Sequence, residues 1–294
     1  MKIELAKTLS KAHAAVFVLK EAAKIEAHPF FKLLGKDDQK YLTNFAKKNA
    51  IRADFADRLL LPSGKELLLL GMPGSAKFNH RKAILAARRV ICLARKEKAR
   101  NIAVHIEDFG LSRFSAAEAC EMLATQLEMA NFEFVEYKTA PKEGWSFVER
   151  VAVVSPQVTQ TFQDALRAGK IIGEEVNKAR ELSNTPGGDM TPALLAKEAQ
   201  KAGREAGFRV KVLDERAMKK LKMGGVLGVA KGSDEPPRFI IMEYLRGKRR
   251  EKPVVLVGKG VTFDTGGLNL KPENSIYEMH MDMSGGAAVI HTIA

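Results

Sequence analysis

The sequence has 294 residues, of which 46% are hydrophobic and 28% charged, a balance that excludes a disordered chain. No apolar run reaches the roughly 18 residues of a membrane-spanning helix, and the N-terminus lacks the uninterrupted apolar segment of a secretion signal. We therefore expect a cytoplasmic protein with no membrane partner. Cys92 and Cys120 each lie in an apolar helical pattern, which predicts two buried free thiols.

The formal net charge of +13 is concentrated near the start of the chain, because residues 1–100 carry 22 Lys and Arg against nine Asp and Glu. Such a region attracts phosphates, so one alternative is a non-catalytic nucleic-acid-binding protein that uses these residues. The other interpretation is a solvated basic surface. The sequence has no zinc-finger or RNA-binding aromatic signature to support the first.

Apolar runs separated by turns predict four strands in the first part of the chain, at 14–20, 57–62, 65–73 and 100–106. Helical patterns separate them. One covers 77–98, where basic pairs recur every seven residues, and another covers 114–130, which opens with Ser115 and Glu118 in capping-box spacing. The alternation of strands and helices predicts an N-terminal α/β domain over residues 1–155.

A second domain is expected over residues 156–294, beginning with a linker helix at about 159–183 that ends in a Pro-Gly-Gly loop. Thr191 followed by proline predicts the start of another helix. The further elements expected are a helix at 192–206, a strand at 208–213, a helix at 214–221, strands at 238–244 and 252–258 with a basic exposed hairpin loop between them, and a helix from Ser284.

The stretch VGKGVTFDTGGLNLKPENSIYEMHMDMSGGAAV, residues 257–289, follows the last predicted strand. That strand is apolar nearly throughout, as a strand covered on both faces would be, and it delivers Lys259 to the sheet edge where α/β ligand sites gather. Asp264, Lys271 and Asp282 follow. These residues suit a divalent cation, because carboxylates bind one directly and a dication can offset the ~5 kcal/mol needed to neutralise a lysine.

Two other interpretations of this stretch remain open. A phosphate-binding turn would explain a lysine beside glycines, but GKGVTFDTGG lacks the GxxxxGK[ST] order and Asp264 would repel an anion. A turn with no ligand would explain the glycines, but it would not explain the two lysines and two aspartates. Spacing by itself therefore does not decide between a metal site and these alternatives.

The stretch resembles the metal and active-site signature of the leucine (cytosol) aminopeptidase family, which are two-metal exopeptidases. The resemblance extends backwards through ARELSNTPGGDMTPALLA, VLDERAMKKLKMGGVLGVAKGS and PPRFIIMEY, and covers most of residues 170–294. It implies that residues 156–294 are the first part of an α/β catalytic domain with a central mixed sheet. The implied activity is the metal-dependent release of N-terminal residues, leucine-type, from peptide substrates.

By that resemblance, Lys259, Asp264 and Asp282 would ligate the tighter of two divalent metal ions, with Asp264 bridging to the looser one. Zinc, manganese and magnesium all suit such donors. Lys271 would be the catalytic lysine that stabilises the developing oxyanion. Met279 matches a position that lines the substrate pocket, although a plain packing role is the alternative. The family does not use the positions of His280 and His291 as ligands, so these are expected to be structural or surface residues.

Family members also supply an aspartate, a glutamate and a bicarbonate-holding arginine from an Asn-Thr-Asp-Ala-Glu-Gly-Arg stretch that this sequence lacks. Only three metal-ligating side chains then remain where the family has five. We therefore expect a C-terminally truncated aminopeptidase with little or no activity alone, and the alternative is a divergent short protein that abandoned catalysis. The family forms homo-hexamers through its catalytic domain, which leaves the oligomeric state of this chain open.

Overall fold

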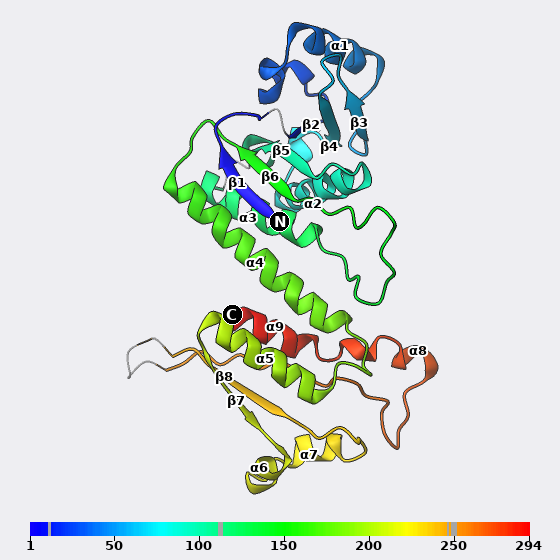
Figure 1. The fold of residues 1–294 in the computed structure, drawn as a ribbon, viewed down its shortest axis with the longest axis vertical. Helices are drawn as coiled ribbons and strands as arrows, with labels where there is room; N and C mark the ends of the chain where they lie inside the picture. Colours follow the sequence, from blue (N-terminus) through cyan, green and yellow to red (C-terminus); the bar gives the residue numbers. More distant parts are fainter. Residues whose placement is uncertain (11–12, 111–113, 246, 248–251) are drawn as a thin grey trace. The chain divides into compact units, whose positions relative to one another are not determined.

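The structure is a computed structural model that describes residues 1–10, 13–110, 114–245, 247 and 252–294 (Figure 1). The chain divides into two compact units, Met1–Glu174 and Glu175–Ala294. The domain boundary expected after residue 155 stays a prediction, because it lies just before the long helix that runs from one unit into the other. Among the described residues, no helix is long and apolar enough to span a membrane.

The first unit is built on a six-stranded sheet with the order β1-β6-β5-β2-β4-β3. All neighbouring pairs are parallel except β3 and β4, which form an antiparallel pair at one edge. This largely parallel sheet confirms the expected α/β class, and it contains an edge strand, β1, that the apolar runs did not reveal. The strands are β1 (Lys2–Ala6), β2 (Ala14–Lys20), β3 (Ala56–Leu60), β4 (Glu66–Met72), β5 (Asn101–His105) and β6 (Arg150–Val154).

Two helices of the first unit begin at side-chain caps that the sequence provides. Asn79 accepts a hydrogen bond from the Lys82 amide at the start of α2, and Ser115 and Glu118 form the expected capping box of α3. The helices are α1 (Lys36–Lys48), α2 (His80–Lys96), α3 (Ala116–Ala130) and the first turns of α4 (Gln160–Asn184), with short 3-10 segments at Ile25–Ala27, Pro29–Leu33, Ser75–Lys77 and Ile106–Phe109.

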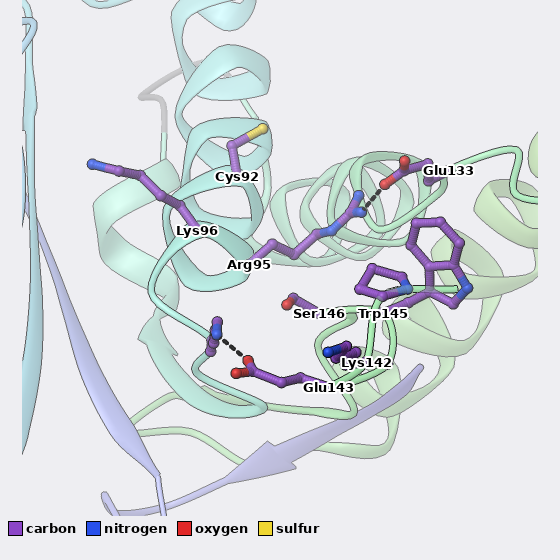
Figure 2. A pocket seen from close by; sticks show the side chains of 11 residues that line it. Cys92, Arg95, Lys96, Glu133, Lys142, Glu143, Trp145 and Ser146 are labelled. Carbon is purple, nitrogen blue, oxygen red and sulfur yellow. Dashed lines mark hydrogen bonds and ion pairs between the residues drawn. The ribbon is translucent and has the colours of Figure 1, made fainter. Parts of the chain in front are cut away.

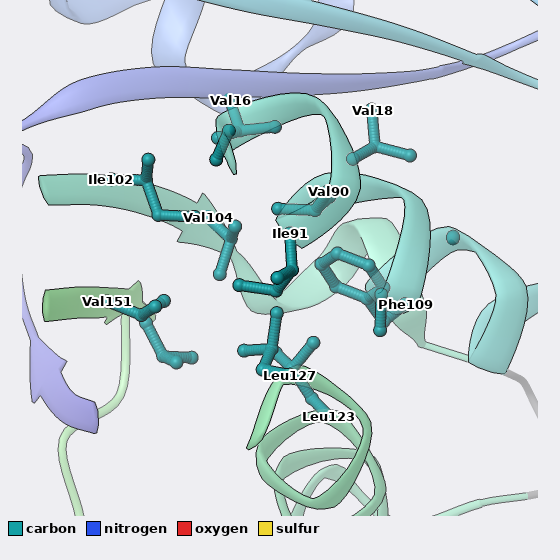
Figure 3. Close-up of a cluster of buried hydrophobic side chains, with 14 of the residues drawn as sticks. Val16, Val18, Val90, Ile91, Ile102, Val104, Phe109, Leu123, Leu127 and Val151 are labelled. Carbon is teal, nitrogen blue, oxygen red and sulfur yellow. The ribbon is translucent and has the colours of Figure 1, made fainter. Parts of the chain in front are cut away.

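Side chains alternate between the two faces of the sheet and form a separate hydrophobic core on each. On one face, Val16 and Val104 pack with Ile91 of α2 and Leu123 of α3, all fully buried. Figure 3 shows α2 and α3 directing their apolar side chains at these strands. On the other face, Phe17 belongs to a second cluster that the first 55 residues help to cover.

The basic pairs of α2 are not simply a solvated surface. The Arg89 guanidinium donates hydrogen bonds to the carbonyls of Ala53 and Gly71, at 2.7 and 2.8 Å. Arg88 donates to the side chain of Gln126 on α3 at 2.7 Å. These arginines therefore help to fasten α2 to its neighbours, and they are engaged by the protein itself.

The two cysteines have different environments. Cys120 is buried in α3, and burial raises the pKa of its thiol to about 11. Cys92 is exposed on α2, so the expectation that it is buried is wrong. It lies one position after Ile91, which turns it away from the stripe that faces the sheet.

A buried polar cluster lies where β5 ends. His28 and Asp108 are joined by a 3.2 Å hydrogen bond between Nε2 and Oδ2, and the His28 ring stacks on Phe17. His105 is also buried, and its Nδ1 atom has no hydrogen-bond partner among the described residues. Burial lowers the pKa of His105. This imidazole is therefore held in its neutral form.

The helix α4 begins in the first unit, where two glycines let it approach α3 closely. A Cβ atom at Gly169 would lie 2.2 Å from the carbonyl oxygen of Glu121, and one at Gly173 would lie 2.6 Å from the Cβ of Glu128. Thr125 also donates a hydrogen bond to the carbonyl of Gly169. The expected linker helix is thus confirmed as an element, and its glycines have a packing role.

The second unit consists of the last turns of α4 and a set of shorter elements around a small core. Leu182 of α4 packs in this core with Leu195, Met283 and Ile290. Thr191 caps α5, as expected, through its side-chain oxygen. The elements are α5 (Pro192–Ala206), β7 (Arg209–Leu213), α6 (Glu215–Lys220), α7 (Gly224–Ala230), β8 (Phe239–Glu243), α8 (Glu273–Ile276), a 3-10 segment Met279–Met281 and α9 (Ser284–Ile293).

The prediction of a strand over residues 252–258 is wrong, because these residues pair with no other strand that the structure describes. The described sheet of this unit holds only β7 and β8, which pair antiparallel, and residues 252–258 are assigned to no strand. Their side chains are not covered either, since Val254 is 89% exposed and Val257 is 91% exposed. The basic hairpin loop expected before them includes residues 246 and 248–251, which lie outside the described residues.

Candidate functional site

Lys259 is positioned by a contact between its own backbone segment and the start of α9. A Cβ atom at Gly258 would lie 2.2 Å from the carbonyl oxygen of Gly285, so only glycine allows this approach. The amide of Gly286 donates a 2.7 Å hydrogen bond to the carbonyl of Lys259. As a result, Lys259 Nζ lies 2.6 Å from Oδ2 of Asp282, a residue just ahead of the helix.

Asp264 and Lys271 form a second pair across a tight turn. The Gly266 amide donates to Asp264 Oδ1 at 2.7 Å, and the Lys271 amide donates to the carbonyl of Thr265 at 2.9 Å. Gly266 has a φ of +97°, a left-handed conformation that favours glycine. The turn brings Lys271 Nζ to 2.5 Å from Asp264 Oδ2 and 3.1 Å from the backbone oxygen of the same residue.

The two pairs are electrostatically connected. The hydrogen bond from Lys271 lowers the pKa of the Asp264 carboxyl, the amide of Gly266 lowers it further, and the positive charge of Lys259 adds to the effect. Asp264 is therefore ionised at neutral pH. With two ammonium groups beside two carboxylates, the cluster has a formal charge of zero, so each aspartate is already neutralised by a lysine that a cation could replace.

The donor set fits one divalent cation. The carboxylates of Asp264 and Asp282 and the amine of Lys259 come from three neighbouring positions, and carboxylate oxygens with one nitrogen suit zinc, manganese or magnesium. Lys259 would have to lose its proton, which a bound dication favours. In the described part of the chain, no group of three or more His, Cys, Asp and Glu side chains could hold a metal, so such a site would need the Lys259 amine beside the two aspartates.

The remaining predicted positions are Met279, His280 and His291. Met279 is half-buried at the start of a 3-10 segment, directly after Glu278, whose φ is +66°. His280 follows it and is also half-buried. His291 lies on α9, where its Nδ1 atom is 2.8 Å from Oε2 of Glu175. The contact between His291 and α4 agrees with a structural role, while the role of Met279 stays a prediction.

Sequence reasoning missed the residues that hold the site in place. Gly258 and Gly285 form the backbone contact, and Gly187 accommodates the ring of Phe263, since a Cβ there would lie 2.8 Å from a ring carbon. The Pro-Gly-Gly loop after α4 is therefore packed against the residue before Asp264. The signal in the sequence was the glycine content of both segments, but turn formation explained those glycines equally well.

The chain is similar to known proteins over most of its length. The model of the cytosol aminopeptidase family's catalytic domain matches residues 177–294. A probable cytosol aminopeptidase of Bacillus subtilis (strain 168) is 33% identical over 255 residues, which is 85% of this chain and 51% of the relative. One from Azoarcus sp. (strain BH72) is 37% identical over 235 residues, which is 78% of this chain and 47% of the relative.

Solved structures show the same fold. A mutant tomato leucine aminopeptidase superposes with a TM-score of 0.80 at 24% identity, covering 100% of this chain and 58% of that one. The bottromycin maturation enzyme BotP in complex with Mn gives a TM-score of 0.74 at 24% identity, covering 97% of this chain and 55% of that one. The chain thus spans about half the length of the relatives that it matches.

Proposed function

We propose that residues 177–294, which match the catalytic-domain model of the cytosol aminopeptidase family, supply part of the active site of a metal-dependent aminopeptidase. The proposed reaction is the release of N-terminal residues, leucine among them, from peptides in the cytoplasm. The observation that supports it is the convergence of Lys259 with Asp282 and of Lys271 with Asp264 at the start of α9 and the turn before it.

In this proposal Lys259, Asp264 and Asp282 would hold the tighter of two divalent ions, and Asp264 would also contribute to the looser site. The ions would polarise the scissile carbonyl and lower the pKa of a bound water. Because its pKa is already lowered, Asp264 is ionised and ready to bind a cation at neutral pH. Zinc, manganese or magnesium as the ion, and a bicarbonate as a further component, belong to the same proposal.

Lys271 has the other chemical role. Its side chain is 25% exposed and its ammonium is held by Asp264. A carboxylate that is engaged by a cation would hold this ammonium less strongly, and Lys271 could then donate a hydrogen bond to the carbonyl oxygen of the substrate. Charge-assisted donors of this kind stabilise the oxyanion that forms during attack. Met279 is proposed to line the pocket for the first side chain of the peptide.

Metal binding can be measured directly on this chain. Titration with Mn²⁺, followed by the electron paramagnetic resonance signal of the free ion, should show binding that Asp282→Asn weakens by roughly tenfold or more, because removing a charged ligand costs more than ~1.4 kcal/mol. Asp234→Asn is the control, since Asp234 lies in an exposed turn remote in sequence from the cluster. Equal Mn²⁺ affinity in the Asp282→Asn variant would refute the proposed ligand set.

Activity is a separate test. We expect the 294-residue chain to cleave a leucyl chromogenic substrate only weakly or not at all, because two of the family's metal-ligating carboxylates and its arginine are absent from the sequence. Robust cleavage that disappears in Lys271→Ala would contradict the expected inactivity while supporting the assigned role of Lys271. Robust cleavage that survives Lys271→Ala would refute that role.

A further inference from the structure

A cavity of about 640 Å³ lies in the first unit, far along the sequence from the lysine and aspartate pairs. It is bounded by the last turns of α2 and by the loop 131–149, which connects α3 to β6 (Figure 2). Its volume falls within the range of ligand-binding pockets, roughly 300–1,000 Å³. The proposed aminopeptidase chemistry gives this cavity no role.

The loop that forms one wall is held firmly. Loops of this length without regular structure are uncommon in compact domains and are usually functional or disordered. Here the side chain of Asn131 hydrogen-bonds to both the amide and the carbonyl of Val148, at 2.9 and 2.8 Å. Glu133 and Glu143 form ion pairs with the α2 end of the cavity. The loop is therefore tied together at its two ends by Asn131, and two ion pairs connect it to the end of α2 and the residues just after it.

The acceptors that line the cavity are already engaged. Arg95 Nη2 lies 2.5 Å from Glu133 Oε2, and its guanidinium also lies over the ring of Phe147, at 4.8 Å. Lys98 forms an ion pair with Glu143. Figure 2 shows Arg95 with Glu133, and Glu143, on the walls of the cavity. A ligand would therefore meet few carboxylate oxygens that are not already neutralised.

The groups that remain are hydrogen-bond donors. The ammonium of Lys142, the indole N–H of Trp145 and the hydroxyl of Ser146 all line the cavity. None of the three has a hydrogen bond or ion pair with any part of the chain that the structure describes. Ammonium and indole groups can only donate, so they select an acceptor-rich, negatively charged partner.

The apolar part of the wall is flat. Trp145 is half-buried and is shown at the cavity in Figure 2, and Pro141 also lines the cavity. An aromatic face of this kind favours stacking with another planar ring, and the cationic groups around it favour an anion. We propose that this cavity binds a small ligand in which a planar aromatic ring carries an anionic group, with the size of a nucleoside monophosphate.

The chain has a single tryptophan, Trp145, so its fluorescence reports directly on the cavity. Titration of the full chain with adenosine monophosphate should change this fluorescence in a saturable way, with a dissociation constant between roughly 10 μM and 1 mM. Lys142→Glu should weaken binding at least about tenfold, since it replaces the free cation with an anion. Lys201→Glu on α5 is the control, because Lys201 is 58% exposed in the other unit, and it should leave the affinity unchanged.

Equilibrium dialysis with labelled adenosine monophosphate gives a second measurement that does not depend on the indole. Absence of saturable binding up to about 10 mM by both methods would overturn the proposal, as would equal affinity in Lys142→Glu. Adenosine that binds as tightly as the monophosphate would overturn the requirement for an anion. Inorganic phosphate that binds as tightly would overturn the requirement for a ring. Weaker binding of both probes is the expected result.

Discussion

Gly258→Ala should open the contact that holds Lys259 beside Asp282. The added Cβ would lie 2.2 Å from the carbonyl oxygen of Gly285, and the backbone must retreat by about 0.8 Å to reach even 3.0 Å. The neighbouring atoms belong to the backbone at the start of α9, so no side chain can rotate out of the way. Overpacking of this kind costs about 1–3 kcal/mol.

The local consequence can be read at the amide of Gly286, which donates to the carbonyl of Lys259 across this contact. Hydrogen exchange measured by mass spectrometry on a peptide that contains this amide should accelerate in Gly258→Ala by roughly 5- to 150-fold, the equivalent of about 1–3 kcal/mol of lost protection. A local probe suits the purpose because a chain of two units need not unfold in one step.

The sequence provides a matched control two positions later. A Cβ at Gly260 would meet nothing closer than a methyl carbon of Leu195 at 3.6 Å, an ordinary contact. Gly260→Ala should therefore leave exchange at Gly286 nearly unchanged. If Gly258→Ala exchanges like the unmodified chain, or if both substitutions accelerate exchange equally, the close approach of the two backbones does not hold the site and this reasoning is refuted.

Three further predictions concern the first unit. Leu123→Ala should lower its free energy of unfolding in urea by about 2–5 kcal/mol, whereas Leu85→Ala at a partly exposed position should cost much less; equal costs would contradict the assigned core. A thiol reagent should label Cys92 quickly and Cys120 only on unfolding, because the Cys120 thiol is buried with a pKa of about 11; fast labelling of both would disprove this. Burial lowers the pKa of His105 below its ordinary value near 6.5, so the unfolded chain binds the proton more readily than the folded chain. The free energy of unfolding should therefore fall as the pH drops below about 6.5, and His105→Gln should make that fall less steep. If the pH dependence of stability is the same in His105→Gln as in the unmodified chain, His105 does not cause it.

The apolar runs of the first unit were correctly predicted as strands, and each of them pairs with at least one neighbouring strand. The ranges expected at 14–20 and 65–73 correspond closely to β2 and β4, which pair with each other in parallel. The run at 252–258 is just as rich in residues that favour strands. A strand also needs a neighbouring strand to hydrogen-bond with, and the composition of the run does not show whether one is present. The helix α7 escaped prediction because GGVLGVA is rich in glycine, which disfavours helices in isolation.

The sequence places four charged residues of the candidate site in one stretch but does not predict which of them pair. The sequence gathered Lys259, Asp264, Lys271 and Asp282 in one stretch because all four follow a single apolar run. That Lys259 pairs with Asp282, and Lys271 with Asp264, depends on the left-handed turn at Gly266 and on the glycine contact with α9. Such contacts depend on the backbone path, which a pattern of residue types does not specify.

Because the apolar run Val254–Val257 is exposed, Lys259 also has a role in keeping the protein soluble. Uncovered β-prone segments tend to stack on identical copies, and proteins commonly flank them with charged gatekeepers that resist such stacking. Lys252 and Lys259 bracket this run. Neutralising Lys259 would therefore reduce the solubility of the protein and also remove the charge next to Asp282. A loss of function in such a variant could come from either effect, and measuring how much protein stays in solution distinguishes them.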